Sequence, residues 1–329
     1  MCASGGDRTA RVIVIGATGH VGTYLVPRLI EAGHEVVAIS RGAATPYKAN
    51  DAWSRVDIRR MDRAALEAEG RFGREIRALE GDIVIDMICF TPESNEQLVT
   101  ALESHVGHFL HTGTIWTHGF SAVVPTPEEA QKKPFGDYGV RKAAIEASLL
   151  KMAHQKNFPA TLIHPGHIVG PGWNPLNPAG HFNPDVFTTL ARGETLSLPN
   201  FGMETVHHVH ADDIAELFMA AIAKPQASIG EAFHAVSEKA VTLRGYAEAM
   251  AAWFGQEAKL EFLPYDAWAE RQSPEDARAT WEHIARSPNC SMEKARRLLD
   301  FTPRHSSLRA VQEAVRWLID NGRIEAKAP

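Results

Sequence analysis

The chain has 329 residues, and its 44% hydrophobic and 22% charged residues are typical of a globular protein large enough for two lobes. A formal net charge of -6 without a lysine and arginine cluster excludes a nucleic-acid surface based on positive charge. Three widely separated cysteines indicate neither a disulfide framework nor a zinc site, no apolar run could span a membrane, and residues 1–10 lack a signal-peptide stretch. We therefore expect a cytoplasmic protein without nucleic-acid or membrane partners.

The first chemical signal is a glycine-rich turn between a strand and a helix. The apolar, β-branched run Arg11 to Ile15 predicts a buried strand, Tyr24 to Ala32 a helix and Glu35 to Ile39 a second strand. In such a βαβ unit a pyrophosphate can approach the glycine backbone and the helix N-terminus. A tight turn without a ligand is the alternative, but the flanking elements favour a dinucleotide site. The residues expected to bind the cofactor here are Gly16, Thr18, Gly19, His20, Val21 and Gly22.

The end of the second strand indicates which dinucleotide is bound. Ser40 and Arg41 stand where an acidic residue would bind the ribose 2′-hydroxyl of NAD. An arginine suits a 2′-phosphate, so the sequence favours NADP(H), with NAD(H) still possible. The alternative is a solvated loop arginine.

Strands and helices continue to alternate to about residue 172, which predicts an α/β fold with a doubly wound parallel sheet. Ligands of such sheets bind at the carboxyl ends of the strands, which here include Ile88 to Phe90 and Thr112 to Trp116. The further predicted strands are Arg55 to Ile58, Asp82 to Cys89, His108 to Thr112 and Phe158 to His164. One further helix is predicted to begin at Asp62. Two others are predicted from Ser94 to Ser104 and from Tyr138 to Gln155.

The second half of the chain predicts a smaller lobe. Residues 173–184 are rich in Pro, Asn and Gly, which is typical of a long functional loop. Thr205 to His210 reads as one strand, and Asp212 and Asp213 as the cap of a helix from Ile214 to Ala223. Further helices are expected within 241–256 and 291–320. The predicted boundaries are 1–172 for the dinucleotide-binding domain, with 203–236 returning to it, and 173–202 and 237–329 for a substrate-binding lobe.

Tyr138 and Lys142 form the candidate catalytic pair. Their spacing puts both side chains on one face of a helix, one turn apart. A phenol has a pKa near 10, which a nearby ammonium lowers, and a hydroxyl such as that of Thr114 could hold the substrate oxygen. Tyr-x-x-x-Lys alone is usually an exposed helical pair, but its position after the glycine turn favours catalysis.

Six blocks of the sequence together match one family pattern. They are Gly16 to Gly22, Thr112 to Thr114, Tyr138-x-x-x-Lys142, Pro165 to Gly172, His210 to Ala215 and Cys290 to Ala295. In these blocks the chain resembles the extended short-chain dehydrogenases/reductases of the NAD-dependent epimerase/dehydratase type. The resemblance covers nearly the whole length and implies a Rossmann-type sheet with a smaller, mostly C-terminal substrate-binding lobe.

The resemblance also implies roles for single residues. Thr114 would donate to the substrate oxygen, Tyr138 would be the catalytic acid/base, and Lys142 would also hold the nicotinamide ribose. It further implies a homodimer formed through the helices at 94–104 and 138–155. The additional residues that would line the cofactor are Asp62 and Arg63 near the adenine, Ile88 and Thr112 along the strand ends, and Pro165, His167 and Ile168 near the nicotinamide.

Three departures from the family pattern narrow the activity. Ile115 and Trp116 replace the Asp-Glu pair of the sugar 4,6-dehydratases and cannot transfer protons, so we expect no dehydration by that route. Thr205 to His208 stand where an arginine commonly grips the sugar-nucleotide diphosphate, and His164 replaces the usual arginine before Pro165. An unactivated sugar, polyol or small ketone therefore competes with a nucleotide sugar.

The remaining candidate residues are expected on the substrate side. Trp116 could stack on a sugar ring, or it could be core, and His167, His181 and His208 could contact the ligand. His208 and His210 share one face of a strand, but without a matched acid they are more typical of packed residues than of a metal site, so we predict no metal.

Three functional hypotheses follow. The leading one is an epimerase-like NAD(P)-dependent oxidoreductase that acts on a secondary alcohol or ketone of a sugar or sugar-like substrate. The alternative is an NADPH-dependent ketone or aldehyde reductase of a non-nucleotide small molecule. A further alternative is a non-catalytic NADP(H) sensor or RNA-associated protein, which would have no need of the Tyr138 and Lys142 pair.

Overall fold

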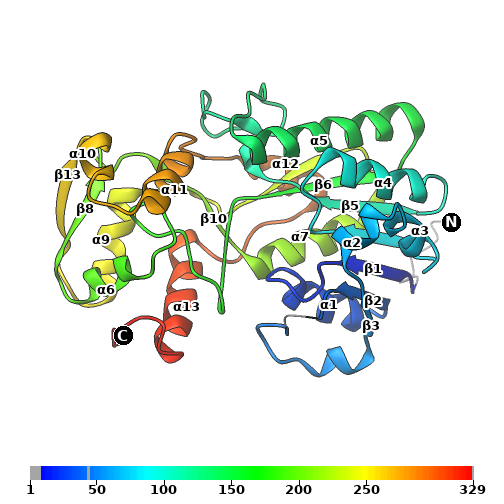
Figure 1. The fold of residues 1–329 in the computed structure, drawn as a ribbon, viewed down its shortest axis with the longest axis horizontal. Coiled ribbons are helices and arrows are strands. Elements are labelled where there is room, and N and C mark those ends of the chain that lie inside the picture. The colour runs from blue at the N-terminus through cyan, green and yellow to red at the C-terminus, as the bar shows by residue number, and fades with distance from the viewer. Residues whose placement is uncertain (1–8, 43–44, 328–329) are drawn as a thin grey trace.

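A computed structural model describes residues 9–42 and 45–327. Cys2 and most of the stretch expected to lack a signal peptide lie outside these residues. The main sheet consists of β1 (Arg11–Ile15), β2 (Glu35–Ser40), β3 (Asp57–Arg60), β4 (Ile83–Asp86), β5 (His108–Thr112), β6 (Ala160–Pro165) and β11 (Ala232–Ala235). All of its pairs are parallel, in the order β11-β6-β5-β4-β1-β2-β3 (Figure 1). This confirms the predicted doubly wound α/β sheet.

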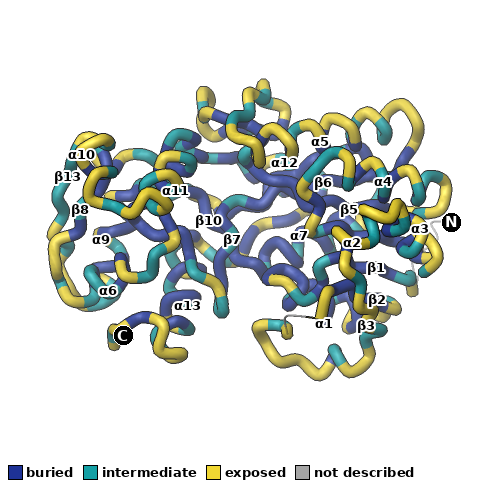
Figure 2. Tube along the Cα trace, in the orientation of Figure 1, coloured by how far each residue is buried: buried dark blue, intermediate teal, exposed yellow. Residues whose placement is uncertain are grey.

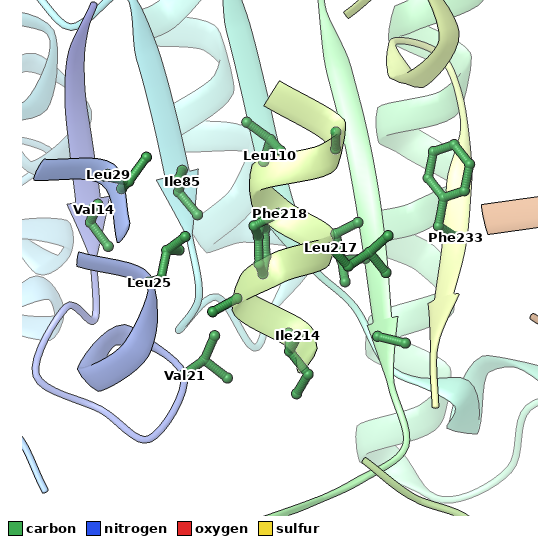
Figure 3. Close-up of a cluster of buried hydrophobic side chains, with 14 of the residues drawn as sticks. Val14, Val21, Leu25, Leu29, Ile85, Leu110, Ile214, Leu217, Phe218 and Phe233 are labelled. Carbon is green, nitrogen blue, oxygen red and sulfur yellow. The ribbon is translucent and has the colours of Figure 1, made fainter. Parts of the chain in front are cut away.

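The two faces of this sheet bury alternate residues of the same strands. Val12 and Val14 of β1 face one core, whereas Ile13 and Ile15 face the other. Figure 3 shows the first core, where α1 and α7 lay apolar side chains against the strands. The elements on this face are α1 (Gly22–Glu31), η1 (Asp51–Arg55), α7 (Ala211–Ala223), α8 (Pro225–Ser228) and α12 (Glu293–Leu299). The elements on the opposite face are α2 (Arg63–Ala68), α3 (Phe72–Arg77), α4 (Pro92–Leu102) and α5 (Asp137–Lys156).

A smaller lobe lies beside the main sheet and has a core of its own (Figure 1). Its parallel pair consists of β8 (Thr195–Pro199) and β13 (Lys259–Leu263). Trp268 and Tyr246 are fully buried in its core, and Figure 2 shows buried chain running through both lobes. Its helices are α6 (Asp185–Ala191), α9 (Leu243–Trp253), α10 (Tyr265–Ala269), α11 (Pro274–Ile284) and α13 (Ser307–Asp320).

Two short strand pairs connect the lobes. The strand predicted from Thr205 to His210 is divided at His207, because its two halves pair with different partners. The first pair joins β9 (Thr205–Val206) to β12 (Val241–Thr242), and the second joins β7 (His167–Val169) to β10 (His208–His210). The backbone N–H of His207, between these halves, donates to His167 Nδ1.

Two other local predictions were displaced. The third strand begins at Asp57, because η1 takes up the residues before it. The Asp212–Asp213 cap was wrong: α7 begins at Ala211, and His210 Nδ1 accepts from the Asp212 N–H at 3.0 Å. The two carboxylates instead bind side chains and backbone of residues 28 and 304–305.

The C-terminal third contributes to both lobes. Cys290, Met292 and Ala295 pack into the core beneath α7, although the predicted boundaries group this segment with the substrate-binding lobe. Those boundaries, and the dimer expected through α4 and α5, stay predictions. Among the helices of residues 9–42 and 45–327, none combines the length and apolar composition needed to cross a bilayer.

Candidate active site

Two adjoining cavities follow the carboxyl ends of the main-sheet strands. Cavity A extends from the glycine turn to Ser40, Arg41 and Asp62. Cavity B extends from the same turn to Thr114, Tyr138 and Lys142. The residues that line both are Gly16, Gly19, Ile88 and Phe90. The sixteen residues predicted to bind the cofactor all line one cavity or the other, so together the cavities form one continuous groove of the kind that a dinucleotide needs.

The glycine turn fits a pyrophosphate for steric reasons. A Cβ atom at Gly22 would overlap the backbone of Ala17, so only glycine lets α1 begin this close to β1. Gly16 has a φ of 89°, which favours glycine, and its N–H donates to Ile39 O at 3.0 Å. The turn is thus a bare backbone surface at the N-terminus of α1, where an anion can bind.

Two arginines line the far end of cavity A, of which one is exposed and the other is paired with a buried carboxylate. Arg41 is exposed at the end of β2, and Asp62 caps α2 by accepting from the Ala65 N–H at 3.1 Å. Arg63 lines the cavity, but its guanidinium donates to the buried Asp86 carboxylate at 2.8 and 3.0 Å. Arg41 is therefore the cavity arginine whose charge is available to a ligand.

The Thr114, Tyr138 and Lys142 side chains converge on cavity B. Thr114 lies two residues after the end of β5, and its Oγ1 accepts from the Trp116 N–H at 3.2 Å, which starts the short helix η2 (Ile115–His118). Tyr138 and Lys142 lie one turn apart on α5. Lys142 Nζ donates to Thr112 O at 2.7 Å and lies 6.0 Å from the centre of the Tyr138 ring.

The pKa values of this pair correct one expectation. Burial raises the pKa of Tyr138 above its usual value, and a hydrogen bond with Thr114 offsets part of that rise. We expected Lys142 to lower the pKa of Tyr138, but this lowering is not found. The Lys142 ammonium donates to Thr112 O and lies 6.0 Å from the centre of the Tyr138 ring. Burial also lowers the pKa of Lys142 to about 8. Both groups are thus held in their neutral forms more firmly than in water.

Trp116 forms an aromatic wall of cavity B and is supported from behind. Its ring meets the Tyr138 ring edge-on, with centres 5.7 Å apart. The Arg286 guanidinium lies between the rings of Trp116 and Phe135, at 3.6 and 3.9 Å from their centres. Trp116 is half-buried, so one part of its ring is free to contact a ligand while the other packs.

The histidines predicted on the substrate side divide into two groups. His167 lines cavity B, and its Nδ1 accepts from the His207 N–H, which leaves a proton on Nε2, an atom without a hydrogen-bond partner among the described residues. His181 and His208 do not line the cavity, which corrects that prediction. Protein groups occupy them: His181 contacts Asn177 and Asp276, and His208 Nε2 donates to Leu176 O at 2.9 Å.

Within the described chain, two clusters have metal-like geometry: Asp86, Cys89 and His111, and His210, His305 and Glu313. In the first, the carboxylate is already bound by Arg63. In the second, His210 Nδ1 accepts from the Asp212 N–H, so the ring proton resides on Nε2, the atom that faces Glu313 at 3.4 Å. A metal ion would have to displace that proton and the cap.

Sequence reasoning missed several lining residues. Trp173 and Phe182 form aromatic parts of cavity B, and Trp173 stacks on His20 with ring centres 4.7 Å apart. Trp173 and Phe182 lie in the loop 173–184 that was predicted to be functional, but nothing in its composition singles them out. Arg286 carried no sequence signal at all.

The comparison with family models decides the classification. The model of the NAD dependent epimerase/dehydratase family matches residues 12–235, which include the glycine turn and the Tyr138 and Lys142 pair. The chain belongs to this family. The extended short-chain resemblance stated above is thereby confirmed.

Curated proteins with several different names are similar to the chain. The chloroplast stem-loop binding protein of 41 kDa b from Arabidopsis thaliana is 26% identical over 248 residues, 73% of this chain and 62% of that protein, so the chain spans under two thirds of that relative's length. The 2′-dehydrokanamycin reductase of Streptomyces kanamyceticus is 25% identical over 320 residues, 97% of this chain and 87% of that protein.

A solved epimerase structure from Methanothermobacter thermautotrophicus has a TM-score of 0.72 at 18% identity and covers 95% of this chain and 93% of its own. At this identity the likeness shows the fold alone.

Proposed function

We propose that the protein is an NADP(H)-dependent oxidoreductase that interconverts a secondary alcohol and a ketone of an uncharged, sugar-like small molecule. The observation that carries this proposal is the convergence of Thr114, Tyr138 and Lys142 on cavity B, next to a bare glycine turn. A hydroxyl, a phenol and an ammonium at the end of a dinucleotide groove are the groups that alcohol–ketone chemistry requires.

Each of the three side chains has a separate role. Tyr138 donates a proton to the carbonyl oxygen in reduction and removes one from the alcohol in oxidation. The Thr114 hydroxyl, which lines cavity B together with Tyr138, orients the same substrate oxygen. The Lys142 ammonium, held by its hydrogen bond to Thr112 O, places a positive charge on α5, the helix that carries Tyr138. It also binds the ribose of the coenzyme.

The coenzyme proposal rests on the cradle and on Arg41. The glycine turn holds the pyrophosphate, and Arg41 binds the 2′-phosphate that distinguishes NADP(H) from NAD(H). Pro165, His167 and Ile168 border the nicotinamide side in cavity B. The nicotinamide supplies the hydride donor or acceptor when it is bound.

The uncharged substrate follows from the electrostatics of cavity B. Among the described residues that line it, Lys142 alone carries a formal charge, and its ammonium is committed to Thr112 O. Burial lowers the pKa of His20 to about 4 and that of His167 well below its usual value, so both are neutral near pH 7. Among the described lining residues a diphosphate would find only the Lys142 ammonium, which already donates to Thr112 O, whereas the Trp116 face suits a sugar-like ring.

The test is a substrate screen with wild type and Tyr138→Phe. Neutral sugars, polyols and cyclic ketones, with UDP-glucose as the charged comparator, are assayed by NADPH and NADH absorbance and by product stereochemistry. We expect NADPH-dependent turnover of a neutral substrate and a loss of about 100-fold or more in kcat for Tyr138→Phe. Undiminished turnover in that variant would contradict the proposal, and a preference for UDP-glucose would contradict the substrate class.

Tyr265→Phe is the matched control. Tyr265 donates its hydroxyl to Ala277 O, outside both cavities, so this variant loses a phenol without touching the site. We expect its kcat to stay within about twofold of wild type. NADPH binding to Tyr138→Phe, measured by nicotinamide fluorescence, separates a lost proton donor from a lost coenzyme site.

Two other candidates have specific support. An epimerase cycle, in which hydride returns to the same substrate, agrees with the fold shared with the solved epimerase, and it would show inverted product without net NADPH turnover. A non-catalytic, RNA-associated role is suggested by the stem-loop binding relative. NADPH binding without turnover of any screened compound would favour that role.

A further inference from the structure

The backbone of Thr114 is held from beneath by a buried imidazole. The Thr114 N–H donates to His164 Nδ1 at 2.9 Å. His164 lies on β6, which pairs with β5 directly before this point, and its exposed fraction is 1%. A strand neighbour therefore fixes the segment that carries the proposed substrate-oxygen ligand.

The segment 112–114 packs tightly against His164. A Cβ atom at Gly113 would overlap His164 Nδ1 and Cε1, so the segment 112–114 rests directly on the imidazole ring. Thr114 Oγ1 also accepts from the Trp116 N–H. The position of the hydroxyl is thus set by the bond from the Thr114 backbone to His164 and by its own bond with Trp116.

The other nitrogen of the ring is turned toward the helix of Tyr138. Because Nδ1 accepts a hydrogen bond, the proton of the neutral ring is on Nε2, which lies 3.2 Å from Glu146 Oε1 in an electrostatic contact without the alignment of a hydrogen bond. Glu146 lies on α5 in line with Tyr138 and Lys142, at successive four-residue steps. Burial opposes its charge, but His164 and Lys132 hold the pKa of Glu146 well below its usual value.

We propose that His164 is a positioning residue for the reaction proposed above, joining Thr114 on one side to the Tyr138 helix on the other through Glu146. The two hydroxyls that must meet one substrate oxygen come from different elements, and the imidazole is the bridge that sets their separation. An arginine, usual at this place in the family pattern, has no acceptor atom and could not receive the Thr114 N–H.

The test compares substitutions that keep or lose the acceptor. In His164→Asn, Oδ1 can take the place of Nδ1, whereas the longer His164→Gln and the acceptor-free His164→Arg cannot offer an acceptor there. Hydrogen exchange of the Thr114 amide is followed by NMR on each full-length variant, with kcat, KM and NADPH affinity measured in parallel. Thermal unfolding checks that each variant is folded.

We expect the Thr114 amide to exchange about tenfold or more faster in His164→Gln and His164→Arg and to stay protected in His164→Asn. In the first two, kcat should fall by about 10- to 100-fold with KM and NADPH affinity little changed, because misplacement affects the reacting geometry. His164→Asn should keep kcat within about fivefold. Glu146→Gln, which retains an acceptor, should give an intermediate kcat.

The exchange and kinetic results have separate meanings. Equal Thr114 exchange in all variants would overturn the inference, whether or not the enzyme turns over. Equal loss of kcat in His164→Asn and His164→Gln would also overturn the inference, because the loss would then come from changed core packing and not from the missing acceptor. Failure of the proposed function appears elsewhere, as Tyr138→Phe with unaltered turnover.

Discussion

The guanidinium of Arg286 lies flat against the Trp116 ring, 3.6 Å from its centre, and donates to Phe135 O at 2.6 Å and to Glu282 O. Arg286 is 2% exposed, and burial lowers its pKa to about 10. Its hydrogen bonds thus fix the aromatic wall of cavity B, which the proposed substrate would contact.

Replacing Arg286 should therefore weaken substrate binding more than catalysis. In Arg286→Gln, loss of the stacked cation and of two carbonyl partners should lower the free energy of unfolding by about 2–4 kcal/mol and raise KM several-fold, with kcat little changed. Urea unfolding and steady-state kinetics measure both effects. Arg278→Gln, at an exposed position on α11, is the control and should change neither.

Arg41 should determine the coenzyme preference. Removing its charge in Arg41→Gln should weaken NADPH binding by about tenfold or more, because charge-assisted hydrogen bonds to a phosphate are lost, and should leave NADH binding nearly unchanged. Fluorescence titration with both coenzymes measures the ratio. Arg77→Gln, an exposed arginine on α3, should leave both affinities as they are. A constant ratio in Arg41→Gln would refute the phosphate contact.

Gly22 should be intolerant of any side chain. Because an added Cβ would overlap the Ala17 backbone, Gly22→Ala must push α1 away from the turn. We expect NADPH affinity to fall by about 100-fold or more, with destabilisation of about 1–3 kcal/mol. Gly107→Ala, where the nearest atom to the new Cβ is 3.3 Å away, tests the general cost of a methyl group. Normal coenzyme binding by Gly22→Ala would show that the cradle is looser than described.

The His305–Asp213 contact should make stability depend on pH. His305 Nδ1 donates to Asp213 Oδ2 at 3.0 Å, and this bond raises the pKa of His305 above its usual value. A raised pKa means that the stabilisation is complete below about pH 6.5 and is lost as the pH rises through the higher folded value. Urea unfolding of wild type and His305→Gln should differ by on the order of 1 kcal/mol more at pH 5.5 than at pH 8.5. A difference independent of pH would exclude a charged His305.

Local patterns predicted the main sheet well because its information is local. The alternation of strand and helix, the glycine spacing and the Tyr138–Lys142 step are each visible within a few residues, and the groove they line follows from the rule of strand ends. The division of 205–210 at His207 could not be read this way, since it depends on which distant strand pairs with each half.

The same limit applied to side-chain partners. Asp212 and Asp213 resembled a cap, but the partners that occupy them, Arg28, Arg304 and His305, lie about 90 or more residues away. His181 and His208 were predicted to contact a ligand. In the structure, His181 instead contacts the Asn177 amide and His208 donates to Leu176 O, and both partners lie in the loop before α6. Arg286 reaches Trp116 only through tertiary packing.

Within cavity B, the stack of Trp173 on His20 joins the glycine turn to the loop 173–184. One ring belongs to the turn proposed to hold the coenzyme, and the other to a surface loop proposed to border the substrate. Exchange of loop 173–184 for that of a relative would therefore alter coenzyme retention together with substrate choice. An engineered change of specificity in this protein has to preserve an indole at position 173 or redesign both sites at once.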